Sequence, residues 1–340
     1  MSGADSTPQP FVRIEGLNVT FSGRGMPVRA VAGVDLDIER GEVVALIGES
    51  GSGKSVTLRS LLRLHPPKRT TMTGRLIVGG HDVMAMDSST LASFRGRVAS
   101  MIFQEPLLAL DPVYSVGDQI VEAIRRHESI GRRAARTRAR ELFERVRIPS
   151  AERRLDAYPH EMSGGMRQRA MIALALACRP QLLLADEPTT ALDATVQIQI
   201  LLLLRELQRD LGLSVIFVTH DIGAAVEVAD RIAVMYAGRI VEQATARTLI
   251  REARHPYTLA LLKGRTGADQ HAMRRGNRLE TISGSPPDLA ALPPGCPFAP
   301  RCPLARDDCR QAEVPPFTMK PGHTARCLHT DETAHAPVAI

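Results

Sequence analysis

A glycine-rich segment near residue 50 constrains the fold of this chain more than any other feature. It follows an apolar strand predicted over 43–47, opens a helix predicted over 55–64, and fits the pattern G-x-x-x-x-G-K-[ST]. The glycines let backbone N–H groups converge on phosphates, and the start of the helix adds a favourable dipole. The pattern predicts a phosphate-binding loop made of Gly48, Glu49, Ser50, Gly51, Ser52, Gly53, Lys54 and Ser55. Lys54 would reach the β- and γ-phosphates, and the Ser55 hydroxyl would bind Mg²⁺.

A pair of adjacent carboxylates follows a strand later in the chain. The apolar run 182–185 ends in Asp186 and Glu187. Ligands of α/β sheets bind at the carboxyl ends of the strands, so both acids are predicted to face the phosphates. Asp186 would hold the Mg²⁺, directly or through water, and Glu187 would orient or deprotonate the attacking water.

The apolar pattern predicts an α/β fold. The strands expected at 182–185 and 214–218 are apolar except for Ser214 and are separated by a helix expected over 194–211. Such strands are covered on both faces, as in a parallel sheet with helices on each side. Further short strands are predicted at 12–14, 17–21, 34–38 and 42–47, and an inserted helical block at about 105–160. After about residue 254 the composition changes to Pro, Cys, His and Gly, which predicts two domains, 1–254 and 255–340.

Four more short motifs occur along the chain in a defined order. Gln104 follows an apolar run, Ser163-Gly-Gly165 lies about 20 residues before the acidic strand, Asp193 follows that strand, and His220 ends the next one. Together they resemble the Q-loop, signature, D-loop and switch histidine of the ATP-binding cassette family, over roughly residues 10–250. The resemblance implies a RecA-like parallel-sheet core, an antiparallel β subdomain and an inserted helical subdomain, with ATP and Mg²⁺ as cofactors.

The resemblance also implies roles for single residues. Gln104 would sense the Mg²⁺ and the attacking water, and His220 would contact the γ-phosphate. Ser163 and Gly165 would close over the γ-phosphate held by the other subunit of a head-to-tail dimer. Phe21 stands where the family places a ring that stacks on adenine, with a plain core phenylalanine as the alternative. The predicted catalytic set is Lys54, Gln104, Glu187 and His220; the Mg²⁺ set is Ser55, Gln104 and Asp186; and Asp193 joins the nucleotide-binding set.

Four of the five cysteines lie in the last 45 residues, with the spacing C-x5-C-x6-C-x17-C. Disulfides are disfavoured in the cytosol, and the C-x2-4-C knuckles typical of zinc sites are missing. Four thiolates can hold a four-iron cluster, while zinc and free thiols stay open as alternatives. The thiols concerned are Cys296, Cys302, Cys309 and Cys327. His323 and His329 are reserve ligands, with plain surface residues as the preferred interpretation.

The tail from His255-Pro-Tyr-Thr onward, and the signature Ser-Gly-Gly-Met, resemble the ATPases of dipeptide, oligopeptide and nickel importers, in particular the D-type subunit. Members of this group with this cysteine pattern carry a [4Fe–4S] cluster, so the resemblance favours one here, in a small metal-binding C-terminal domain. It also implies ATP-driven peptide import with two membrane permease subunits and a second ATPase subunit, either a sister chain or an identical copy. An extracytoplasmic peptide-binding protein would act indirectly, and the chain would sit peripherally on the cytoplasmic face of the cell membrane.

The alternative from another class is a soluble ATPase that acts on nucleic acid or ribosomes. The net charge of +6 is concentrated between residues 125 and 154, where 11 Arg face 4 Glu. Helical spacing of these arginines favours a solvated helix face over a nucleic-acid patch. Aromatic residues make up only 4% of the chain and Trp is missing, so stacking surfaces for single strands are scarce. No nucleic-acid partner is therefore expected. Neither a secretory signal nor an apolar run of about 20 residues is found in the sequence.

Overall fold

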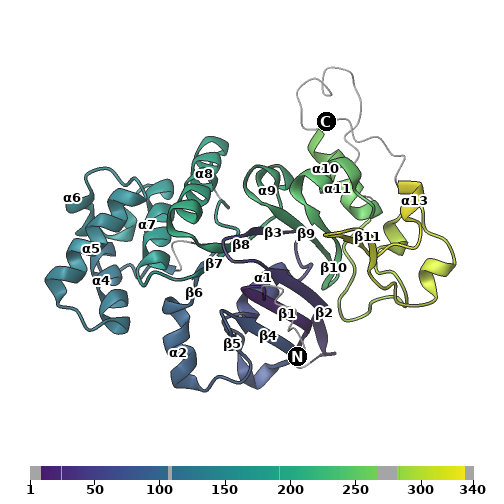
Figure 1. Ribbon diagram of the computed structural model, residues 1–340, viewed down its shortest axis with the longest axis horizontal. Coiled ribbons are helices and arrows are strands. Elements are labelled where there is room, and N and C mark those ends of the chain that lie inside the picture. The colour runs from purple at the N-terminus through teal and green to yellow at the C-terminus, as the bar shows by residue number, and fades with distance from the viewer. Residues whose placement is uncertain are drawn as a thin grey trace, which may run out of the picture.

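The computed structural model describes residues 9–23, 25–105, 109–190, 192–266, 282 and 284–333. A large mixed sheet runs through the middle of the molecule in the order β11-β12-β10-β9-β3-β8-β7-β6 (Figure 1). Five neighbouring strands are parallel, which agrees with the predicted parallel sheet, although only the strands at 43–47, 182–185 and 214–218 were predicted individually. The five are β9 (Arg231–Tyr236), β3 (Val43–Ile47), β8 (Ser214–Thr219), β7 (Leu182–Asp186) and β6 (Ala99–Ile102). All residues of β3, β7 and β8 are buried, because helices and the second sheet cover both faces.

Helices flank this sheet and carry the loops that emerge from its strand ends. They are α1 (Lys54–Ser60), α7 (Gly164–Leu176), α8 (Ala194–Leu211), α9 (Ile222–Val228), α10 (Ala246–Glu252) and α11 (Pro256–Thr266). The prediction for 194–211 matches α8 residue for residue, since Asp193 caps its start and Gly212 adopts the left-handed conformation at its end. The prediction of 55–64 for α1 was too long, because the backbone at Arg63 turns to φ 48°.

A second, antiparallel sheet packs beside α1 in the order β2-β1-β4-β5. Its strands are β1 (Val12–Phe21), β2 (Val28–Ile38), β4 (Thr70–Val78) and β5 (His81–Asp82), with a short 3-10 helix at Pro67–Arg69 and α2 at Ser88–Arg97. The two short strands expected at 12–14 and 17–21 are one strand whose register with β2 shifts between Ile14 and Leu17. This sheet is the antiparallel subdomain that the sequence implied.

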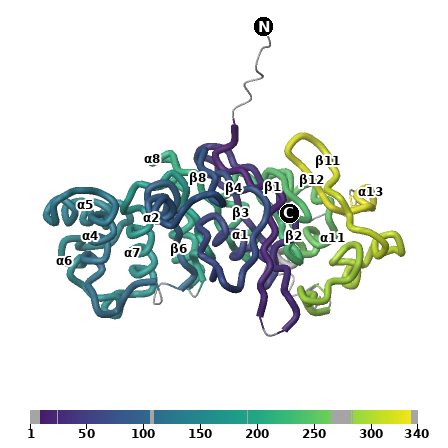
Figure 2. The backbone as a smooth tube through the Cα atoms, turned by 90° about the horizontal axis from the view of Figure 1, so that it is seen from below, coloured from purple at the N-terminus to yellow at the C-terminus, as the bar shows by residue number. Residues whose placement is uncertain are grey.

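The inserted helical block contains α4 (Val116–His127), α5 (Arg132–Arg145), α6 (Ala151–Leu155) and a 3-10 helix at Pro159–Glu161. It lies at one end of the molecule, next to α7 (Figures 1 and 2). Apolar side chains of α4 and α5 are buried, whereas several arginines pair with acids: Arg132 with Asp118, Arg136 with Asp156, Arg138 with Glu128, and Arg147 with Glu206. The charge of this helix face is thus partly compensated.

The segment after residue 284 lies at the opposite end and extends the large sheet (Figure 2). It holds two 3-10 helices, Ala299–Arg301 and Asp308–Arg310, then β11 (Phe317–Lys320), β12 (His323–Ala325) and α13 (Thr330–Thr333). Strand β12 pairs antiparallel with β10 (Arg239–Thr245) and joins the tail to the sheet. Within the described residues, no helix is both long and apolar enough to cross a bilayer.

Candidate active site

The phosphate loop follows β3 and turns sharply into α1, and two glycines allow this path. Gly48 has φ 151°, and a Cβ there would lie 2.2 Å from the Met235 carbonyl oxygen. Gly53 has φ 102°, and its Cβ would lie 2.5 Å from the Ala30 carbonyl oxygen. Any larger residue at either position would force the loop away from the neighbouring backbone. The loop therefore packs closely against the neighbouring backbone.

Lys54 lies at the start of α1 and is buried. Its ammonium group donates to the carbonyl oxygens of Gly48 and Glu49, both at 2.8 Å. Burial lowers the pKa of Lys54, an effect opposed by the carboxylates of Glu187, Asp186 and Glu49. The ammonium thus sits inside the curve of the loop, where a phosphate group would offer it a stronger acceptor than backbone carbonyls.

Ser55 and Asp186 meet at the carboxyl end of β7. The Ser55 hydroxyl donates to Asp186 Oδ1 at 2.6 Å, and Asp186 has no exposed surface. Two oxygens in neighbouring positions of an octahedral Mg²⁺ site lie about 2.9 Å apart, so this pair fits such an ion closely. Arg59 Nη2 lies 3.1 Å from Asp186 Oδ2 and compensates the buried charge.

Glu187 follows Asp186 with a backbone φ of 47°, a left-handed conformation that is rare for residues other than glycine. Its Oε2 accepts from Gln104 Nε2 at 3.2 Å and from Thr190 Oγ1 at 2.9 Å. His220 Nδ1 lies 3.6 Å from the same oxygen. The structure therefore brings Gln104, Glu187 and His220 together, although 83 residues separate the first two along the chain.

Three of the predicted nucleotide-binding residues, Ser163, Gly165 and Asp193, lie outside the phosphate loop, at the starts of α7 and α8. Ser163 caps α7 by accepting from the Met166 N–H, and Asp193 caps α8 by accepting from the Val196 N–H. A Cβ on Gly165 would lie 3.1 Å from Val196 Cγ1, so the two helix starts are close neighbours. Among the hydrogen bonds of the described residues, none joins Ser163 to the phosphate loop of its own chain. Ser163 is exposed and available to another molecule.

Phe21 lies at the end of β1, half-buried against the apolar core under the small sheet. Its ring makes an edge contact with His65, with ring centroids 5.4 Å apart. Both interpretations of Phe21, adenine stacking and core packing, remain compatible with this position.

Sequence reasoning missed two residues that organise the acidic pair. Arg59 neutralises Asp186. The sequence could have predicted this role, because Arg59 lies four residues after Ser55 and therefore on the same face of α1. Thr190 holds Glu187 and belongs to the quoted motif that follows the acidic pair, but nothing in the sequence distinguished it from Thr189.

The four tail cysteines line one cavity together with His255, Phe298 and His329. A backbone hydrogen bond joins two of these cysteines, since the Cys296 N–H donates to the Cys309 carbonyl at 2.8 Å. Burial raises the pKa of Cys327 to about 12, and the other three cysteines add to this shift. A hydrogen bond from the His329 N–H opposes it. Neutral thiols are therefore favoured unless a cation enters the cavity and stabilises their thiolates.

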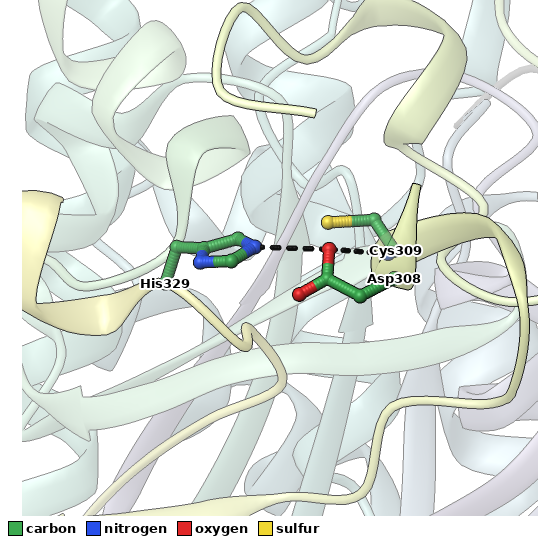
Figure 3. Close-up of side chains that lie close together, drawn as sticks. All are labelled: Asp308, Cys309 and His329. Carbon is green, nitrogen blue, oxygen red and sulfur yellow. Dashed lines mark hydrogen bonds and ion pairs between the residues drawn. The ribbon is translucent and has the colours of Figure 1, made fainter. Parts of the chain in front are cut away.

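The two histidines near these cysteines are not plain surface residues, which corrects the preferred interpretation from the sequence. His323 is buried on β12 and its Nε2 lies 2.8 Å from Oε1 of the buried Glu242 on β10. His329 lines the cysteine cavity, and its Nε2 lies 3.2 Å from Asp308 Oδ1 beside Cys309 (Figure 3). Both histidines are positioned by carboxylates that the sequence pattern could not assign to them.

Comparison with known proteins agrees with this geometry. Residues 31–190 match the family described as ABC transporter, and residues 241–309 match the one described as oligopeptide/dipeptide transporter, C-terminal region. A Brucella abortus protein, provisionally named a peptide import ATP-binding protein, is 48% identical over 96% of this chain and 99% of its own length. The dipeptide transport ATP-binding protein of Bacillus subtilis is 44% identical over 97% of this chain and 98% of its own length.

The chain belongs to the ATP-binding cassette transporter family. A solved dimeric cassette in a post-hydrolysis state, bound to ADP and phosphate, is 28% identical with a TM-score of 0.63. It aligns with 69% of this chain and 99% of its own, so the remainder of this chain is additional to that cassette. The fold is that of an ATP-binding cassette ATPase with mixed α/β sheets, and ATP hydrolysis follows from membership of the family.

Proposed function

We propose that this chain is the ATP-hydrolysing subunit of a peptide importer and drives uptake through partner membrane permeases. One combination carries this conclusion: a phosphate loop and acidic pair arranged for hydrolysis, on the same chain as the oligopeptide/dipeptide transporter C-terminal region. The named relatives, similar over nearly their whole length, support it.

The side chains suggest how hydrolysis would proceed. Lys54 would turn from the loop carbonyls to the β- and γ-phosphates, and Ser55 with Asp186 would hold Mg²⁺, with Gln104 joining them. Bound Mg²⁺ would neutralise charge on the phosphates. The three groups that face the Glu187 carboxylate all lie at Oε2, which leaves Oε1 to accept a proton from the attacking water. His220 is exposed and would reach the γ-phosphate.

A complete site would need a second subunit. Ser163 and Gly165 lie at the start of α7, and the Asp193 cap lies beside them on α8, so this surface would close over nucleotide held by the partner. The partner is proposed to be a sister ATPase, with an identical copy as the alternative. Two permeases and, indirectly, an extracytoplasmic peptide-binding protein would complete the importer, with this chain peripheral on the cytoplasmic face of the membrane.

The cysteine cavity is proposed to hold a [4Fe–4S] cluster on Cys296, Cys302, Cys309 and Cys327. Four thiolates on one tetrahedral zinc would lie about 3.8 Å from one another. In the described part of the chain, the one set of three or more candidate ligand atoms within 4.8 Å of one another is Asp308, Cys309 and His329, so no three of the four sulfurs are that close. A cubane separates its thiolates more widely, because each ligates a different iron, so a cluster does not require the sulfurs to lie that close. Its role would be structural.

The rival function, action on nucleic acid or ribosomes, has less support. The arginines of α5 that would form a basic patch are partly engaged by neighbouring acids. Co-expression with two candidate permease subunits and affinity purification of this chain separates the two functions. Import predicts that both permeases co-purify and stimulate ATP hydrolysis, whereas stimulation by nucleic acid or ribosomes and no permease binding would overturn it.

A further inference from the structure

Glu49 of the phosphate loop is held by residues from the far end of the chain. Its carboxylate accepts from both Arg301 terminal nitrogens, at 2.6 and 2.9 Å. Its backbone N–H donates to the Tyr257 hydroxyl at 2.8 Å. Arg301 is 252 residues away in sequence, so this contact exists only in the folded chain. The same Glu49 supplies one of the two carbonyls that accept from the Lys54 ammonium.

Arg301 is a buried and oriented partner. Its side chain is only 6% exposed, and Nη1 also donates to the Tyr236 hydroxyl at 3.2 Å. The guanidinium carbon lies 5.9 Å from the Tyr236 ring centre and 6.0 Å from that of Phe298. Its hydrogen bonds to Glu49 raise the pKa of Arg301, so the guanidinium stays protonated. A planar guanidinium bound through two nitrogens fixes both the position and the charge of its carboxylate.

The loop that presents Arg301 is part of the cysteine cavity. Arg301 ends the 3-10 helix Ala299–Arg301 and directly precedes Cys302. The Ala299 N–H donates to the Cys296 carbonyl and the Cys302 N–H to the Ala299 carbonyl, so the segment between these two cysteines is a tight turn. Phe298 of the same turn is buried against Tyr236 and Tyr257. A change in the positions of Cys296 and Cys302 would therefore move Arg301.

We propose that Arg301 is a positioning residue for the nucleotide site and that through it the cysteine cavity controls the affinity of the phosphate loop for nucleotide. A carboxylate in a phosphate-binding loop repels the bound phosphates unless it is neutralised. Arg301 cancels the charge of Glu49 and, with Tyr257, fixes the loop backbone. The inference rests on the proposed nucleotide site but not on the identity of any metal in the cavity.

The affinity for Mg²⁺ with a non-hydrolysable ATP analogue, measured by isothermal titration calorimetry on the full chain, tests this proposal. Arg301→Met is expected to weaken binding on the order of tenfold, and Arg301→Lys less, because Lys keeps the charge but loses the paired hydrogen bonds. The matched control is Arg310→Met, an exposed arginine of the same tail, which should leave affinity unchanged. Unchanged affinity in Arg301→Met would overturn the proposal.

A double variant separates charge cancellation from simple loss of packing. Glu49→Gln combined with Arg301→Met removes the uncompensated carboxylate and should restore affinity to within about threefold of the parent chain. No restoration would show that Arg301 acts only as a structural residue. Lys54→Ala checks the nucleotide site itself: full affinity in that variant would overturn the proposed site rather than the Arg301 link.

Cys302→Ser tests the connection to the cavity. It should weaken nucleotide binding in the parent chain but cause little further change in the Glu49→Gln, Arg301→Met background, where the link is already cut. Circular dichroism and thermal unfolding show whether the Cys302→Ser variant folds. If it does not fold, Cys302→Ala is measured in its place. Equal losses in both backgrounds would overturn the connection between the cysteine cavity and the phosphate loop.

Discussion

Replacing Glu187 by glutamine should abolish turnover while leaving nucleotide binding intact. Glutamine has nearly the same shape, and its carbonyl oxygen can still accept from Thr190 Oγ1, which lies 2.9 Å from Glu187 Oε2. The amide cannot take a proton from water. Loss of a general base typically costs about 10² to 10⁴ in rate, which corresponds to about 3 to 5 kcal/mol in the activation barrier. We therefore expect at least a hundredfold lower rate of phosphate release.

Phosphate release and nucleotide binding must be measured on the same preparation, with the permeases present. The matched control is Glu227→Gln, an exposed glutamate on α9, which should hydrolyse ATP at the parent rate. Glu187→Gln should also favour the closed dimer when ATP is present, because the trapped nucleotide stays intact. A rate within about threefold of the parent would remove Glu187 from the role of base and would leave the strained backbone at φ 47° without a catalytic explanation.

Three further predictions concern assembly, acid stability and the tail. Ser163→Arg should bind ATP through its own phosphate loop yet lose dimer closure and turnover; a monomeric preparation whose rate per chain does not depend on concentration would contradict the shared site. Burial lowers the pKa of His255 to about 4, and Glu242 opposes this shift. Between pH 6.5 and 4 the histidine is therefore protonated in the unfolded chain but neutral in the folded chain. The free energy of unfolding should then fall by about 3 kcal/mol across that window, and a urea titration series should lose this slope in His255→Gln. Anaerobically purified protein should be brown with close to four iron atoms per chain, and Cys309→Ser, but not Cys178→Ser, should lose the colour; stoichiometric zinc without iron would refute the cluster.

Local sequence determined the parts of the protein whose conformation depends on near neighbours. The glycines at 48 and 53 allow the turn that aims Lys54 and Ser55 at one point, and no distant residue is needed to predict it. The strands at 182–185 and 214–218 could be found because both faces are buried and every position is apolar or small. Helix α8 could be bounded because Asp193 and Gly212 signal its two ends.

Only the tertiary structure decided which distant segments became neighbours. The pairing of β12 with β10 attaches the tail to the central sheet, and it depends on two strands of 3 and 7 residues whose composition favours no particular partner. Arginine is common in this chain, so its sequence position alone could not assign Arg301 to Glu49. These contacts follow from the order of strands in the sheet, since that order determines which loops meet at its edge. Long-range contacts of this kind carry no local pattern, and for that reason the sequence predicted the chemistry of the nucleotide site but not its connection to the cysteines.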